Sequence, residues 1–221
     1  MNLGELPPRD RDAILAEGRR TRIARGDFAY TPGAPVDAVY FVIEGRVKIV
    51  RTRASGSESI VGIRSPGDVF GEISATLGTA LRTTSAIALE DGALARIDVA
   101  TFLRLLRADA ALASAFARGL ARRLAAAGRE LVELAGKSVP GRLVDALGRL
   151  AADHGVREPD GALRIALSLT HKDLADLIGT SRETLTKELG VLADVGLVRV
   201  SHREIVLIAP QAFPFARRRD G

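Results

Sequence analysis

The sequence predicts an α+β protein with an antiparallel β-roll (a jelly-roll-like arrangement), then one long helix, then a winged helix-turn-helix. Three observations support this order. Short β-branched and aromatic runs alternate with Gly- and Pro-containing turns between residues 21 and 98. A Pro-free, Ala-rich stretch with helical periodicity follows from 99 to about 136. Two short amphipathic segments then meet at a turn near residue 179, ahead of two β-branched runs.

The composition is that of a globular protein. The 221 residues suffice for two modest domains, and 47% apolar with 27% charged residues excludes a disordered chain. Apolar runs stay well below 18 residues, and the first residues lack a basic start and an apolar core, so we expect neither a membrane span nor a signal peptide. The expected compartment is the cytoplasm. A net charge of +5 is only a weak indication of an anionic partner.

The scarcity of cysteine and histidine restricts the chemistry. With no cysteine, the chain cannot form disulfides, zinc fingers, thiolate nucleophiles or cysteine-ligated iron–sulfur clusters. All three histidines would have to converge to form a histidine metal site, so we expect no metal. We find no convergent acid–base pair and no nucleophile beside a base, so we expect no enzymatic activity.

Residues 1–98 are predicted to form the effector domain. It begins with a short helix within residues 1–20, and the roll follows from about residue 21. The runs 39–43, 47–50 and 60–63 are rich in β-branched and aromatic residues. Turn signals separate such runs every 10 to 15 residues, for example Glu44-Gly45 and Pro66-Gly67-Asp68. This spacing is typical of an antiparallel roll or barrel.

Residues 99–137 are predicted to form one long helix with a dimer-forming stripe. Its small and apolar residues are spaced alternately by four and three positions, a mean period of 3.5, which favours a coiled-coil partner. The alternative is a helix packed on its own domain. The stripe consists of Ala113, Ala117, Leu120, Leu124, Ala127, Leu131 and Leu134.

Residues 138–221 are predicted to form a winged helix-turn-helix that binds DNA. Thr170 and Asp173 have the spacing of a capping box, Gly179 can end the first helix in a left-handed conformation, and Ser181 is a good N-cap for the second. The runs 198–200 and 204–208 are expected to form the wing. The alternative is an ordinary pair of helices with a solvated charged face.

The second of these helices would expose its charged residues at its first turns, because Leu185, Leu189 and Leu192 face inward. Arg182, Glu183 and Lys187 are our candidates for contacts with base edges, since arginine can donate two bonds to guanine and glutamate can accept from cytosine N4. The candidates for phosphate contacts are Thr170, Lys172, Ser181 and Thr184.

A second set of residues, in the roll, has the chemistry of a phosphate site. Gly71 allows close backbone approach, Ile73-Ser74 begins a short helix with unpaired N–H groups, and Arg82 supplies a charged fork. Glu72 is a poor neighbour for phosphate but a good acceptor for a ribose hydroxyl.

Residues 179–184 resemble the recognition helix of the cyclic-AMP receptor branch of the Crp/Fnr transcription regulators. Residues 69–75 with Arg82-Thr83-Thr84 resemble the phosphate-binding cassette of cyclic-nucleotide-binding domains. The resemblance covers nearly the whole chain. It implies a homodimer that binds palindromic double-stranded DNA, contacts RNA polymerase and responds to cyclic AMP. It also implies that Glu72 binds the ribose, that Arg82 binds the phosphate with help from Thr83, and that Lys187 stands where an arginine is usual.

One departure from that family affects the effector. A Thr-Ser pair contacts adenine in the cyclic-AMP receptor, and the corresponding residues here are Ala127 and Gly128, which cannot hydrogen-bond a base. Two alternatives therefore stay open: a regulator that is active without an effector, and a cyclic-nucleotide module that acts through protein contacts. No His or Cys lies within residues 1–136, so we expect neither the haem nor the iron–sulfur cluster of other branches.

Overall fold

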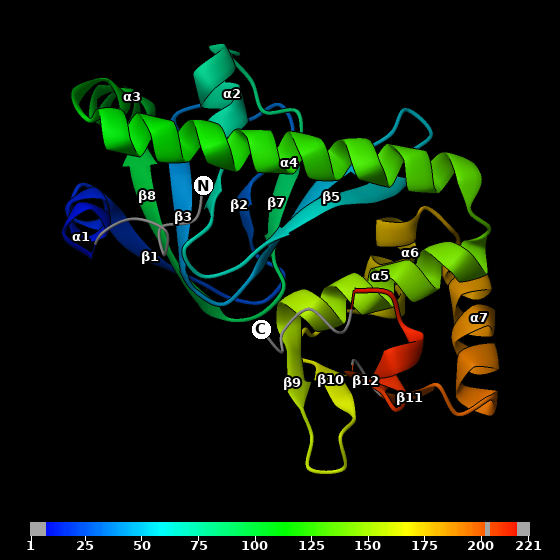
Figure 1. Ribbon diagram of the computed structural model, residues 1–221. Helices are drawn as coiled ribbons and strands as arrows, with labels where there is room; N and C mark the ends of the chain where they lie inside the picture. Colours follow the sequence, from blue (N-terminus) through cyan, green and yellow to red (C-terminus); the bar gives the residue numbers. More distant parts are fainter. Residues whose placement is uncertain (1–7, 202–203, 216–221) are drawn as a thin grey trace. The chain divides into compact units, whose positions relative to one another are not determined.

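The computed structural model describes residues 8–201 and 204–215, with the backbone alone at 8–10 and 129–135 (Figure 1). By its internal contacts the chain divides into a first unit that ends at Gly128 and a second that begins at Arg129. The predicted fold class, β-roll followed by helices and a C-terminal helix-turn-helix, is confirmed.

The first unit is a roll of two four-stranded antiparallel sheets. One sheet has the order β1-β8-β3-β6 and the other β2-β7-β4-β5. The strands are β1 (Arg19–Ile23), β2 (Phe28–Tyr30), β3 (Ala38–Glu44), β4 (Val47–Thr52), β5 (Glu58–Arg64), β6 (Val69–Phe70), β7 (Ser85–Ala88) and β8 (Gly92–Asp98).

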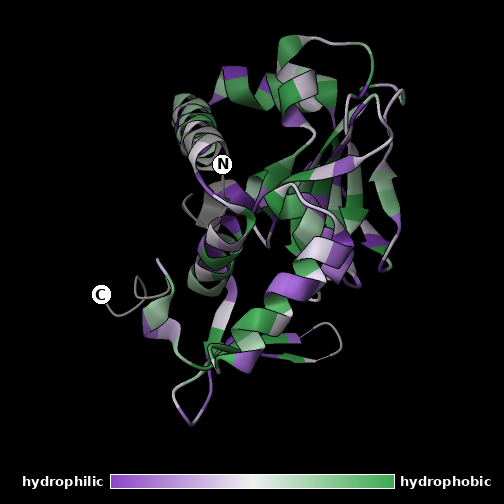
Figure 2. Cartoon of the chain, turned by 90° about the vertical axis from the view of Figure 1, so that its right-hand side faces the viewer, coloured by the Kyte–Doolittle hydropathy of each residue, from purple (hydrophilic) through white to green (hydrophobic). Residues whose placement is uncertain are grey.

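Strand β3 of the first sheet is covered on both faces, by the roll interior on one and by helices on the other. Its alternate residues pack on opposite faces: Tyr40 and Val42 lie inside the roll, whereas Val39 and Phe41 pack against the helices. A strand that is buried on both faces has a continuous apolar sequence, as Val39–Ile43 does. Figure 2 shows apolar residues gathered along the strands of the roll.

Four helices accompany the roll. They are α1 (Pro8–Ala16), α2 (Glu72–Leu77), α3 (Val99–Ala108) and α4 (Ala110–Gly136). Ile14 of α1, Phe102 of α3 and Phe116 of α4 join one apolar cluster on the helix-covered face of β3. In Figure 1, α4 runs across the strands of the roll.

The helix expected over 99–137 is in fact two helices, α3 and α4, which meet at Asp109. The backbone of Asp109 is extended, and its carboxylate accepts bonds from the N–H groups of Ala111 (2.8 Å) and Leu112 (3.0 Å). Aspartate is a strong N-cap, so this side chain starts α4 and separates it from α3.

Helix α4 has two apolar sides. Leu112, Ala115 and Phe116 pack on the roll, and Leu120 of the predicted stripe packs against the same cluster. The other described stripe residues are more exposed: Ala113 is partly buried, Ala117 and Ala127 are exposed, and Leu124 is 76% exposed. The predicted stripe residues Leu131 and Leu134 lie among the side chains that the structure does not describe.

In its described residues, the second unit contains three helices and a four-stranded sheet. The helices are α5 (Val139–His154), α6 (His171–Ile178) and α7 (Arg182–Asp194), and a 3-10 turn, η2 (Pro210–Ala212), follows the last strand. The sheet order is β11-β12-β10-β9, with β9 (Gly155–Arg157), β10 (Leu163–Ile165), β11 (Val198–Ser201) and β12 (Glu204–Leu207). The expected hairpin β11–β12 is present, and β9 and β10 extend it beyond what the sequence predicted. Within the described residues, no helix is long and apolar enough to cross a membrane.

Candidate effector site and nucleic-acid interface

The turn before α2 requires glycine at position 71. Gly71 has φ +76°, and a Cβ atom there would lie 2.9 Å from Nη1 of Arg82. The carbonyl oxygen of Gly71 accepts a 2.8 Å hydrogen bond from the same nitrogen. The glycine therefore lets the backbone approach the guanidinium closely. The predicted approach of this backbone to a phosphate stays a prediction.

Arg82 is buried beneath this turn with only 3% of its surface exposed. Besides Gly71, its guanidinium donates to the carbonyl oxygen of Ala38 and lies 4.4 Å from the ring centre of Tyr30. Its Nε–H is buried and has no hydrogen-bond partner among the described residues. A buried cation with one unused donor is suited to an anionic ligand, since burial strengthens a charge-assisted bond.

Glu72 begins α2 and is 1% exposed. Its Oε1 accepts a hydrogen bond from Nη1 of Arg123, which lies on α4. Nearly complete burial of a carboxylate is tolerated because it is paired. Glu72, the residue predicted to accept from a ribose, is thus bonded to α4.

We call Tyr30, Gly71, Glu72 and Arg82 the cradle. A Cβ atom at Gly71 would lie 3.3 Å from Cε1 of Tyr30, and the guanidinium of Arg82 lies 4.4 Å from the centre of the same ring, so these residues and the adjacent Glu72 lie together. Burial raises the pKa of Tyr30. Other predicted ligand residues lie at its edge: Ser74 is partly buried, whereas Ile73 and Thr83 are exposed.

Two arginines near the cradle were not among the predicted ligand residues. Arg123 pairs with Glu72, and Arg64, the last residue of β5, is influenced by the charges of Arg123 and Glu72. Burial is the main cause that lowers the pKa of Arg64, followed by Arg123. A sequence signal existed for Arg64, since it follows the apolar run 60–63 at the end of a predicted strand.

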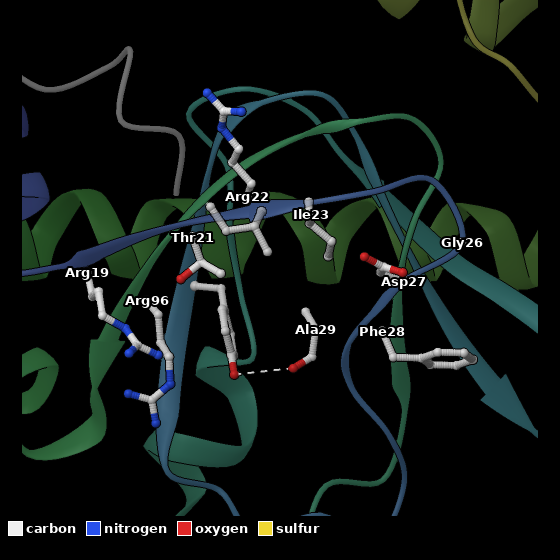
Figure 3. A pocket seen from close by; sticks show the side chains of 11 residues that line it. Arg19, Thr21, Arg22, Ile23, Gly26, Asp27, Phe28, Ala29 and Arg96 are labelled. Atoms are coloured by element: carbon white, nitrogen blue, oxygen red, sulfur yellow. Dashed lines mark hydrogen bonds between the residues drawn. The ribbon is translucent and has the colours of Figure 1, made fainter.

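A surface pocket of about 420 Å³ opens elsewhere on the first unit, beside β1 and β2 (Figure 3). Arg19, Arg22 and Arg96 line it, and the hydroxyl of Tyr40 donates to the carbonyl oxygen of Ala29 (3.3 Å) within it. None of the predicted ligand residues lines this pocket. The cradle, which contains Gly71, Glu72 and Arg82, is therefore the candidate effector site.

In the second unit, α6 and α7 form the predicted helix-turn-helix. Thr170 and Asp173 form a reciprocal capping box at the start of α6. Gly179 ends α6 with φ +67°, and the hydroxyl of Ser181 accepts from the N–H of Thr184 (3.1 Å) to start α7. Each local device that the sequence indicated is therefore present.

The three candidates for base contacts share one exposed surface of α7. Arg182, Glu183 and Lys187 are exposed, whereas Leu185 and Leu189 of the same helix are buried. Hydrogen bonds from its own backbone N–H and from the side chain of Ser181 lower the pKa of Glu183. Glu183 is therefore an ionised acceptor at the helix N-terminus, as a contact to cytosine N4 requires.

The four candidates for phosphate contacts differ in their internal bonds. The hydroxyl of Thr170 donates to Asp173 (2.7 Å), and Lys172 pairs with Asp176 (2.6 Å). The hydroxyl oxygens of Ser181 and Thr184 lie 3.0 Å apart. Whether these four residues contact phosphate stays a prediction.

Comparisons with known proteins match both parts of the chain to domain families. Residues 20–109 match the cyclic nucleotide-binding domain family, and residues 141–213 match the Crp-like helix-turn-helix domain family. The chain is similar to the cyclic AMP receptor protein of Thermus thermophilus, with 34% identity over 216 residues and 96% of each chain covered. It is also similar to the CRP-like cAMP-activated global transcriptional regulator of Mycobacterium tuberculosis, with 33% identity, 83% of this chain and 81% of that one.

A solved structure of a c-di-GMP-responsive global regulator from Xanthomonas campestris aligns with a TM-score of 0.78. It has 26% sequence identity and covers 91% of this chain and 99% of that chain. The resemblance drawn from residues 69–84 and 179–184 is confirmed. Because the two domain families match in order and a relative at 34% identity spans the chain, the chain belongs to the Crp/Fnr family of DNA-binding transcription regulators.

Proposed function

We propose that this regulator is a homodimer that recognises a palindromic DNA site and that a cyclic nucleotide, cyclic AMP or a relative of it, controls its DNA affinity. The observation that best supports DNA reading is the exposed turn of α7 with Arg182, Glu183 and Lys187 above the buried Leu185 and Leu189. Two such helices in a symmetric dimer would enter major grooves one helical turn apart, about 34 Å.

The exposed part of the α4 stripe, which consists of Ala117, Leu124 and Ala127 among the described side chains, supports the dimer. Leu124 is an apolar side chain that is 76% exposed, and it continues the 3.5-residue spacing of Ala113, Ala117 and Leu120. Exposed apolar residues at this period are typical of a helix that packs against a second copy of itself. Ala residues in the stripe would allow the two helices to approach closely.

The pair Glu72–Arg123 supports control by the roll. Glu72 belongs to the cradle and Arg123 to α4, so a ligand that donates a hydrogen bond to Glu72 changes a bond that α4 makes. A ribose hydroxyl that donates to Glu72 would share its carboxylate with Arg123. The position of α4, and with it the dimer contact, then depends on the ligand.

The proposal is tested by measuring DNA binding and nucleotide binding on the same protein. A palindrome selected from random DNA is titrated by fluorescence anisotropy without nucleotide and with cyclic AMP or cyclic GMP, while calorimetry measures nucleotide binding. We expect nucleotide to raise affinity for the selected site. E72Q is expected to weaken nucleotide binding, and E44Q, an exposed glutamate paired with Arg20, serves as the control.

Two results would contradict parts of the proposal. No heat with either nucleotide, together with full affinity for the palindrome, would show a regulator that works without this effector. Failure of selection to enrich any palindrome would indicate a nucleotide-binding module that acts through protein contacts.

A further inference from the structure

Arg64 is a charged residue on the apolar inner wall of the roll. It pairs across the strands with Val47, and Gly62 pairs with Ile49. Residues directly opposite in an antiparallel pair lie on the same face, and Val47 and Ile49 belong to the core inside the roll. Arg64 therefore points to the interior, where its neighbours along the sheet are apolar.

The wall has room for this guanidinium, but Arg64 makes few bonds there. A Cβ atom at Gly62 would lie 2.6 Å from Nη1 of Arg64, so the absence of a side chain at 62 makes the space. Nη1 donates to the carbonyl oxygen of the adjacent Ile63 (3.1 Å). Nε–H is buried and has no hydrogen-bond partner in the described part of the chain. A ligand that supplies an acceptor to this N–H would remove the desolvation penalty of the buried donor and so favour binding.

Arg64 lies beside the Glu72 end of the cradle. Its side chain points into the roll interior, where Tyr30 of the cradle also lies, and the charges of Arg123 and Glu72 act on its guanidinium. A nucleotide with its phosphate at Arg82 and its ribose at Glu72 would place its base toward Arg64 and α4. The α4 residues 124–128, Leu-Ala-Ala-Ala-Gly, offer that base no polar side chain.

We propose that Arg64 recognises the base of the effector and that the site prefers a 6-oxopurine cyclic nucleotide, cyclic GMP, over cyclic AMP. This inference rests on the proposed binding of a cyclic nucleotide in the cradle. The guanidinium presents only donors. Guanine offers two acceptors, O6 and N7, on one edge, whereas adenine offers one acceptor and one donor there. Adenine would leave one donor of Arg64 unpaired and bring its own amino group against it.

The test compares four nucleotides by calorimetry on the full chain. Cyclic GMP has both acceptors, cyclic IMP keeps them without the 2-amino group, 7-deaza-cyclic GMP lacks N7, and cyclic AMP lacks O6. We expect cyclic GMP and cyclic IMP to bind roughly 5- to 100-fold more tightly than cyclic AMP, the range of one bidentate arginine–guanine pair. The 7-deaza compound should lose much of that advantage.

Three variants show whether Arg64 is responsible. R64L should remove the preference, and R64K should also remove it because an ammonium keeps the charge without the planar fork. R51L, which removes an exposed arginine from β4, should retain it.

Distinct results would overturn the inference. A wild-type protein that binds cyclic AMP as tightly as cyclic GMP, or a preference that survives in R64L, would refute base recognition by Arg64 but leave nucleotide control intact. If R64L weakened all four nucleotides equally, Arg64 would act on the phosphate or ribose. Binding of none of the four would refute both this inference and the proposed nucleotide control.

Discussion

Arg182→Ala is the most direct test of DNA reading because the side chain has no structural role in the described fold. Arg182 is the first residue of α7 and is exposed. Only its backbone oxygen takes part in a hydrogen bond that the structure shows, from Thr186 (2.8 Å). Removal of a positive charge from a helix N-terminus is neutral or slightly stabilising, so we expect the unfolding temperature to stay the same or rise.

The expected loss is one of specificity. One arginine that donates two bonds to guanine discriminates against a wrong base by about 1–3 kcal/mol. In a dimer with two equivalent half-sites the effect doubles to about 2–6 kcal/mol, which is roughly 30- to 10⁴-fold in the dissociation constant for the cognate palindrome. Affinity for random DNA depends on phosphate contacts and should change far less.

The assay is fluorescence anisotropy with the selected palindrome and with a scrambled duplex at several salt concentrations. R107A removes an equal charge from the exposed end of α3 and should leave both affinities close to those of the wild type. If R182A weakened binding to the palindrome and to the scrambled duplex by the same factor, Arg182 would contact phosphate, and its assignment as a base-reading residue would be wrong.

Three further variants test other parts of the structure. T170A removes the capping box of α6 and should lower the free energy of unfolding of the second unit by about 1 kcal/mol in denaturant titrations. The hydroxyl of Ser138 makes no capping hydrogen bond at the start of α5, so S138A should have little effect. Equal losses in the two variants would contradict the role of the Thr170 cap. L124R should convert the dimer to a monomer in sedimentation equilibrium, whereas L77R, at another exposed leucine, should not; a dimeric L124R would show that the stripe is not the interface. G71A should lower the free energy of unfolding of the first unit by roughly 1–2 kcal/mol, because residue 71 has a positive φ, and should weaken nucleotide binding in calorimetry. Unchanged nucleotide binding would show that this turn is not part of the effector site.

The sequence predicted best those features that depend on neighbouring residues. The capping box at Thr170, the left-handed Gly179 and the cap at Ser181 are each set by a few consecutive residues, and the structure contains all three. Asp109 is a local signal of the same kind, but the helical periodicity continues on both sides of it, so periodicity alone predicts one helix where the structure has two.

Features that depend on distant residues could not be predicted in this way. Strands β9 and β10 have three residues each, too short for an alternating pattern, and β10 is held by β12 some forty residues later in the chain. The pairing of Glu72 with Arg123 joins residues 51 positions apart. Sequence patterns identify Glu72 as a candidate ligand residue, but only the fold shows which cation lies against it.

The position of Arg123 gives a physical reason why the roll and the dimer contact should be coupled. Arg123 and Leu124 are consecutive on α4, so their side chains leave the helix about 100° apart. The first bonds Glu72 in the cradle, and the second lies on the exposed stripe. An effector that alters the Glu72–Arg123 bond therefore acts at the same helical turn as the predicted dimer contact, without a long chain of intermediate side chains. Because α4 is a continuous helix through this turn, a change in its rotation or position would be transmitted to the partner helix directly.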